Sequence, residues 1–79
     1  MEIAHLIGMA NQIAEFFEAL PDRSEAVKGV AQHLRNFWAP GMRKQLIVYV
    51  VNGADNTLNP LAREAALMLH AELAGKAAR

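Results

Sequence analysis

Apolar residues recur at every third or fourth position along much of the chain, a spacing that predicts amphipathic helices. The first stretch covers residues 3–20 and stops before Pro21, because a proline disfavours helical backbone in the residue preceding it. The second covers residues 23–37 and follows Asp22, whose carboxylate is a typical N-cap. Gly29 interrupts the second helix at a cost of about 1 kcal/mol relative to alanine, so we expect another helix to approach closely there.

A third helix is predicted over residues 40–52, with Pro40 in its first turn and its end at Asn52-Gly53. Its segment 46–51, LIVYVV, is rich in β-branched residues and would also pass for a buried strand. We favour the helix, because the rest of the sequence offers no partner strand to satisfy the backbone hydrogen bonds.

The fourth helix is predicted over residues 59–74, with Asn59 as its cap and Gly75 near its end. The last residues, 76–79, are expected to fray. With 79 residues the chain is long enough for one domain only. We therefore predict an all-α fold in which residues 1–79 form a compact bundle of four short helices.

The pattern contains more apolar surface than such a bundle needs, since 53% of the residues are hydrophobic. Residues 46–51 are apolar all round, which is typical of a helix that is central or covered by something else. Phe16 is adjacent to Phe17, and Phe37 to Trp38, and adjacent positions point about 100° apart on a helix. We expect Phe37 to close the core, and Phe16 and Trp38 to face a partner. The alternative is that these aromatics cover the edge of the core.

Charge is unevenly distributed on a chain whose net charge is zero, a balance that argues against general nucleic-acid binding. Residues 23–44 carry five cations and one acid, and the rest of the chain carries the opposite excess. This basic segment either steers docking onto an acidic or phosphate-bearing partner or forms an ordinary solvated helix face.

No arrangement of residues indicates catalysis or metal binding. The chain has no cysteine and a single serine, Ser24, in a capping turn without a nearby base. Its histidines, His5, His33 and His70, fall on three predicted helices, without a carboxylate or second histidine three or four residues further on. The only weak indication of ligand binding is the start of the third helix, where free N–H groups could meet a phosphate.

Neither the N-terminal residues nor the longest apolar run indicates export or membrane insertion. The N-terminal residues lack the basic region of a signal peptide, and the run at 46–51 is far shorter than the ~20 residues that span a bilayer. We expect a cytoplasmic protein with no contact with membranes.

Three stretches carry a resemblance to a known family: MANQIAEFFEALP at 9–21, VAQHLRNFWAPGMRKQL at 30–46 and LNPLAREAALML at 58–69. Together they resemble the delta subunit of soluble, NAD-dependent, molybdenum-containing formate dehydrogenases. The central stretch is the most specific, because it combines His-Leu-Arg, Phe-Trp, a proline and Met-Arg at fixed spacing. Ala39 departs from the acidic residue common in relatives, which would weaken the N-cap of the third helix.

The resemblance implies a non-catalytic accessory subunit that docks on the large catalytic subunit and either stabilises the enzyme or helps to assemble it. The molybdopterin guanine dinucleotide, the iron–sulfur clusters and the FMN would belong to the partner subunits, and this chain would carry no cofactor. The alternative is a free-standing helical binding module, or a homodimeric assembly chaperone for a nucleotide-bearing cofactor.

Mapping the family's motif onto this chain, together with its aromatic and basic corner, yields a set of candidate partner-interface residues. They are Phe16, His33, Arg35, Trp38, Met42 and Arg43.

Overall fold

The computed structural model describes residues 2–53 and 57–77, the last two of these for their backbone only. These residues form four helices and no strand: α1 (Ile3–Phe17), α2 (Arg23–Phe37), α3 (Pro40–Val51) and α4 (Pro60–Ala77). The all-α prediction is confirmed, and residues 46–51 are helical. A helix satisfies its own backbone hydrogen bonds, whereas a lone strand there would not.

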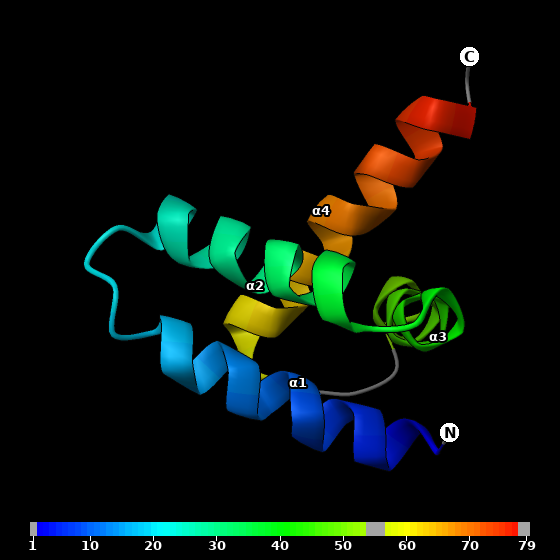
Figure 1. Cartoon of the computed structure of the whole chain (residues 1–79). Helices are drawn as coiled ribbons and strands as arrows, with labels where there is room; N and C mark the ends of the chain where they lie inside the picture. The colour runs from blue at the N-terminus through cyan, green and yellow to red at the C-terminus, as the bar shows by residue number, and fades with distance from the viewer. Residues whose placement is uncertain (1, 54–56, 78–79) are drawn as a thin grey trace.

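Figure 1 shows how the four helices are arranged. Helices α1 and α2 run antiparallel side by side, α4 crosses behind them, and α3 is viewed nearly end-on next to the end of α2. The C-terminal half of α4 extends beyond the other helices, and residues 70–75 are all exposed.

The core draws on every helix and is rich in alanine, whose small side chain lets helices approach closely. The apolar positions of α2 are buried from Ala26 to Leu34, and Leu58 closes the core from the loop before α4. The apolar positions of α4 are buried only in part, because Leu69 is buried but Leu73 lies on the extending half and is 55% exposed. The core residues are Leu6, Ile7, Ala10, Ala14, Ala26, Val27, Val30, Ala31, Leu34, Trp38, Leu46, Ile47, Val50, Leu58, Leu61, Ala62, Ala65, Ala66 and Leu69.

Local groups set three helix boundaries as predicted, at Asp22, Asn59 and Gly53. The Asp22 carboxylate accepts a hydrogen bond from the Ser24 N–H at 2.9 Å, and Asn59 Oδ1 accepts one from the Leu61 N–H at 2.8 Å. Gly53 follows α3 with φ +64°, a conformation that favours glycine over residues with a side chain.

Two helix ends differ from the prediction by more than one residue. Helix α1 ends at Phe17 rather than residue 20, because the chain reverses through a tight turn in which the Leu20 N–H bonds the Phe17 carbonyl. Helix α4 continues through Gly75 to Ala77, since a glycine without positive φ weakens a helix but does not end it. The expected fraying concerns residues 76–79; residues 78 and 79, and the side chains of the two before them, lie outside the described residues.

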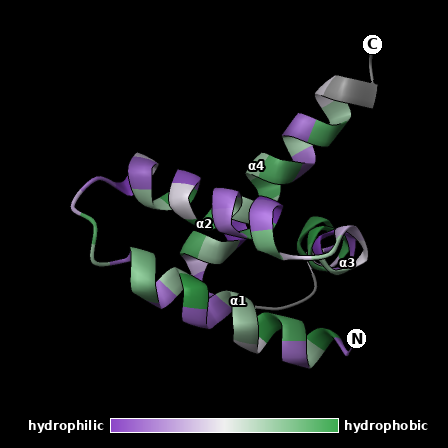
Figure 2. Ribbon diagram, in the orientation of Figure 1, coloured by the Kyte–Doolittle hydropathy of each residue, from purple (hydrophilic) through white to green (hydrophobic). Residues whose placement is uncertain are grey.

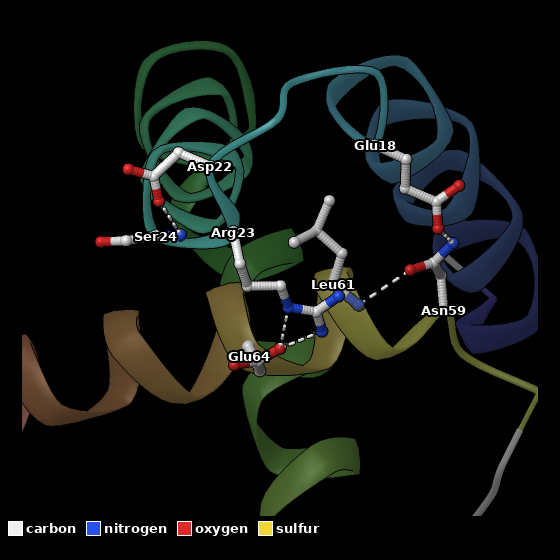
Figure 3. A network of polar contacts seen from close by, with 7 residues as sticks. All are labelled: Glu18, Asp22, Arg23, Ser24, Asn59, Leu61 and Glu64. Carbon is white, nitrogen blue, oxygen red and sulfur yellow. Dashed lines mark hydrogen bonds and ion pairs between the residues drawn. The ribbon is translucent and has the colours of Figure 1, made fainter.

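Polar side chains connect elements that are distant in sequence (Figure 3). Asn59 Nδ2 donates to Glu18 Oε2 at 2.8 Å, which joins the start of α4 to the end of α1. Asn11 of α1 adds a second connection, accepting from the Asn59 N–H at 2.7 Å and donating to the Thr57 carbonyl at 3.1 Å. These bonds hold the loop before α4 against α1.

Helix α3 is hydrophobic around much of its circumference, whereas the face of α2 seen in Figure 2 carries many hydrophilic residues. Nevertheless α3 is not central in the bundle. Leu46, Ile47 and Val50 are buried, but Val48 and Val51 are about half exposed. The structure therefore contradicts a central place for this segment, and its cover by something else stays a prediction.

Candidate functional site

A groove between α1 and α2 gathers most of the aromatic residues of the chain, and we call it the aromatic groove. It encloses about 640 Å³ and is lined almost entirely by apolar and aromatic side chains. Its lining residues are Met9, Gln12, Ile13, Phe16, Phe17, His33, Phe37 and Trp38.

The spacing of these residues explains why they share one surface. The five on α1 lie at positions i, i+3, i+4, i+7 and i+8, which form one helix face. On α2, His33 and Phe37 are four residues apart and therefore also adjacent on the helix surface. Because the two helices run antiparallel, Phe16 and Phe37 lie toward opposite ends of the groove (Figure 1).

These two phenylalanines are the most exposed large hydrophobic residues described, at 75% for Phe16 and 74% for Phe37. Exposed aromatic side chains around an apolar hollow are characteristic of interaction sites. Transferring one such side chain from water into an interface stabilises the complex by about 1.5–3 kcal/mol.

Phe17 forms part of the groove wall by packing on the backbone of Gly29. A Cβ atom added at Gly29 would meet Cε1 of the Phe17 ring at 2.4 Å. The expectation of a close helix approach at Gly29 is thus confirmed. The Phe16 ring stands edge-on to that of Phe17, with centroids 5.1 Å apart and an interplanar angle of 87°.

His33 is the one imidazole in the groove. Its ring centroid lies 4.8 Å from that of Phe37, and its Nδ1 atom is buried without a hydrogen-bond partner among the described residues. The described residues contain no group of three or more His, Cys, Asp or Glu side chains able to hold a metal ion.

The structure reverses the expected roles of the two corner aromatics. Trp38 is buried at 5% exposure, whereas Phe37, expected to close the core, is exposed. Phe37 and Trp38 lie three and four residues after Leu34, so helical spacing places both near the side of α2 that carries Leu34. Helix α2 ends at Phe37, and the backbone of Trp38 is extended (φ −92°, ψ 142°). The indole of Trp38 is buried and lines the inner wall of the groove.

Two of the candidate interface residues make bonds within the chain instead of lining this groove. Arg43 Nη1 donates to three carbonyls at the end of α2: Trp38 at 2.6 Å, Arg35 at 3.0 Å and Leu34 at 3.3 Å. Arg35 Nη2 contacts both carboxylate oxygens of Glu72 on α4, at 2.9 and 3.0 Å. Their contact with a partner stays a prediction.

Two of the five cations of the basic segment are paired with acids inside the molecule. Besides the Arg35–Glu72 pair, Arg23 of α2 forms an ion pair with Glu64 of α4 (Figure 3). Two cations of α2 therefore meet acids of α4, whereas Lys28 and Lys44 are exposed and form no salt bridge among the described residues.

Of the six candidate residues, Phe16, His33 and Trp38 line the aromatic groove, and Met42 is half-buried against the core. The other residues that line the groove are not among those six: Met9, Gln12, Ile13, Phe17 and Phe37. The period of α1 places these residues of α1 on the face that carries Phe16, a signal that was present in the sequence.

A second groove, between α3 and α4, was not predicted as a site, and we call it the α3–α4 groove. Its lining residues are Pro40, Arg43, Lys44, Ile47, Val48, Val51, Asn52, His70 and Leu73. It shares no lining residue with the aromatic groove.

Within the described part of the chain, no helix is long and apolar enough to cross a membrane.

Comparison with known proteins yields one family. The model of the family described as NADH-dependant formate dehydrogenase delta subunit FdsD matches residues 5–66, well over half of the chain. All lining residues of the aromatic groove fall within that match, whereas His70 and Leu73 of the other groove fall outside it. Neither the curated proteins nor the solved structures include a match.

Proposed function

The chain belongs to the FdsD family of NADH-dependent formate dehydrogenase delta subunits, and from this premise we propose that it is a non-catalytic subunit docking on the large, molybdenum-containing subunit through the aromatic groove. The observation that carries the docking is the exposure of Phe16 and Phe37 on the two ends of one apolar hollow.

The lining of the groove supports a protein partner with an apolar surface. None of its lining residues carries a permanent charge, and Phe16 and Phe37 offer the large aromatic area that dominates many protein interfaces. Burial of both rings would contribute up to about 6 kcal/mol to the free energy of binding, before the entropy lost on association is subtracted.

The large subunit is the partner we choose because both roles considered for this chain require contact with it. A delta subunit that stabilises the enzyme must bind the assembled catalytic subunit, and one that assists cofactor insertion must bind its cofactor-free form. The chain has no cysteine, the usual ligand of iron–sulfur clusters. We therefore assign the clusters to the partner subunits, and we propose that those subunits also carry the molybdopterin guanine dinucleotide and the FMN.

The test is recovery of the large subunit with tagged delta chain from cells that express every subunit. The variant Phe16→Ser/Phe37→Ser is expected to lower recovery more than tenfold, since interface hot spots contribute about 2 kcal/mol or more each. The control Leu20→Ser/Leu67→Ser removes two exposed leucines that line neither the aromatic groove nor the α3–α4 groove, and should leave recovery unchanged.

Unchanged recovery with the phenylalanine variant would show that docking occurs elsewhere on the chain. Recovery of the large subunit with its molybdenum supports a structural subunit, and recovery of only the cofactor-free form supports an assembly role. If the wild-type chain recovers only copies of itself, the proposal is wrong and the homodimeric module takes its place.

A further inference from the structure

We infer that the α3–α4 groove is a second docking site, and that its occupant is an amphipathic helix of another subunit with acidic residues at one end. This inference depends on membership in a multi-subunit enzyme and not on what fills the aromatic groove. The delta chain would then hold two elements of the complex together.

The shape of the groove suits a helix. The residues of α3 that line it run from Pro40 to Asn52 at helical spacing, so one entire face of α3 forms the wall. At 1.5 Å per residue this wall is about 18 Å long, which corresponds to roughly three turns of a docked helix. Apolar anchors at i, i+3, i+4 and i+7 of such a helix would meet the groove.

The apolar surface in the groove lacks a cover within the described chain. Val48, Val51 and Leu73 are 48%, 51% and 55% exposed. Leu73 lies on the half of α4 that extends beyond the bundle, where residues 70–75 are all exposed. Helices depend mainly on packing for stability in water, so an occupant would stabilise this extending half.

Charge selects the occupant. Arg43 and Lys44 line the end of the groove near Pro40, His70 lines its α4 side, and none of the described lining residues is acidic. Lys44 is exposed and forms no salt bridge among the described residues, unlike Arg23 and Arg35, which are paired within the chain. A partner helix with Glu or Asp at that end would complement this charge. Among its described lining residues, a second copy docked groove to groove would offer Lys44 no acid, which favours another subunit over a homodimer here.

The experiment is site-specific photo-crosslinking in the purified complex, with benzoylphenylalanine placed at position 51 in one sample and at position 16 in another. Crosslinked peptides are identified by mass spectrometry. We expect position 51 to reach a segment of another subunit that has an apolar helical period and at least two acids within one turn of the contact. That segment should differ from the one reached from position 16.

The charge argument has its own matched pair of variants. Lys44→Glu should lower the crosslink yield from position 51 about threefold or more, the size expected for reversing one partly exposed charge. Lys28→Glu reverses an exposed lysine on α2 that lines neither the aromatic groove nor the α3–α4 groove, and should leave the yield unchanged.

A crosslink from position 51 only to a second copy, only to a segment without acids, or to nothing would overturn the inference. So would equal yields for Lys44→Glu and the wild type. A crosslink from position 51 without one from position 16 would overturn the docking proposed for the aromatic groove and leave this inference standing.

Discussion

At the scale of single residues, the corner between α2 and α3 is organised by the burial of one aromatic side chain. Leu34 is followed at three and four residues by Phe37 and Trp38, and a helix of 3.6 residues per turn brings both near the same face. Only one is buried. The indole offers more apolar area than a phenyl ring, and the helix ends just where its backbone can turn inward.

Replacing the buried aromatic should therefore cost far more stability than replacing the exposed one. Trp38→Ala is expected to lower the free energy of unfolding by about 3 kcal/mol or more, since large-to-small changes in a core leave a cavity. Phe37→Ala should change it by less than about 0.5 kcal/mol. Urea denaturation of the isolated chain followed by circular dichroism measures both, and the reverse order would contradict the burial seen here.

Arg43 secures the same corner from α3. One guanidinium nitrogen donates to three carbonyls at the C-terminal end of α2, where positive charge is also favoured by the helix dipole. Arg43→Met keeps much of the aliphatic stem and removes these bonds. It should destabilise the chain by about 1–2 kcal/mol.

Lys44→Met is the control for that substitution, because Lys44 is exposed and makes no such bonds with the end of α2. Thermal unfolding of both variants gives the comparison. Equal melting temperatures would mean that the Arg43 hydrogen bonds contribute nothing measurable to the stability of the isolated chain.

At the scale of elements, the α1–α2 pair depends on a glycine matched to an aromatic ring. Gly29→Ala would gain about 1 kcal/mol of helix propensity, but its methyl group would overlap the Phe17 ring. We expect a net destabilisation of about 1 kcal/mol, the range seen for overpacking. In a Phe17→Ala background the same change should instead stabilise the chain.

A double-mutant cycle over these two positions, measured by urea denaturation, isolates the coupling between them. The sign reversal is the decisive result. If Gly29→Ala has the same effect in both backgrounds, the close approach of α1 does not explain the glycine.

The α2–α4 pair is matched in charge. The basic excess of α2 faces Glu64 and Glu72, but these ion pairs are nearly half exposed. Such pairs contribute about 0–1 kcal/mol each. They therefore favour one alignment of α2 on α4 more than they stabilise the fold, which rests on the apolar core between the helices.

At the scale of the whole molecule, the bundle is a compact body with one extending helix end. Amide hydrogen exchange in the isolated chain should follow that division. Residues 61–69 of α4 include core positions and should exchange slowly, whereas residues 70–75, all exposed, should exchange fast through local opening.

Amide hydrogen exchange in the assembled complex provides a second test of the division between the core part of α4 and its extending half. If a partner helix fills the α3–α4 groove, exchange at residues 70–75 should slow at least tenfold on assembly, because opening would then require dissociation. Slow exchange at these positions already in the isolated chain would show that the extending half of α4 is stable without a cover.

Surplus apolar surface is the other property of the whole molecule. The high hydrophobic content is not fully used in one core, and the excess is displayed in two separate grooves that share no residue. A subunit with this surface is suited to contact neighbours on two sides, which is consistent with a family named as part of a larger enzyme.

The sequence by itself determined the helices and most of their boundaries. Asp22, Asn59 and Gly53 act through bonds and backbone conformations within a few residues, so their effects can be inferred from neighbours along the chain. The excess of apolar residues and the family resemblance were visible at the same level. Phe16 was correctly predicted to be exposed, because adjacent helix positions cannot both face one core.

Only the tertiary structure decided which side chains the fold buries and which it leaves exposed. The period of α2 allowed either Phe37 or Trp38 to be buried, and the direction of the chain after the helix selected Trp38. Arg35 and Arg43 found partners 37 and 5–9 residues away, respectively, that spacing along the chain could not reveal. Burial and pairing depend on how helices cross, and crossing is set by the fit of whole faces rather than by any local sequence.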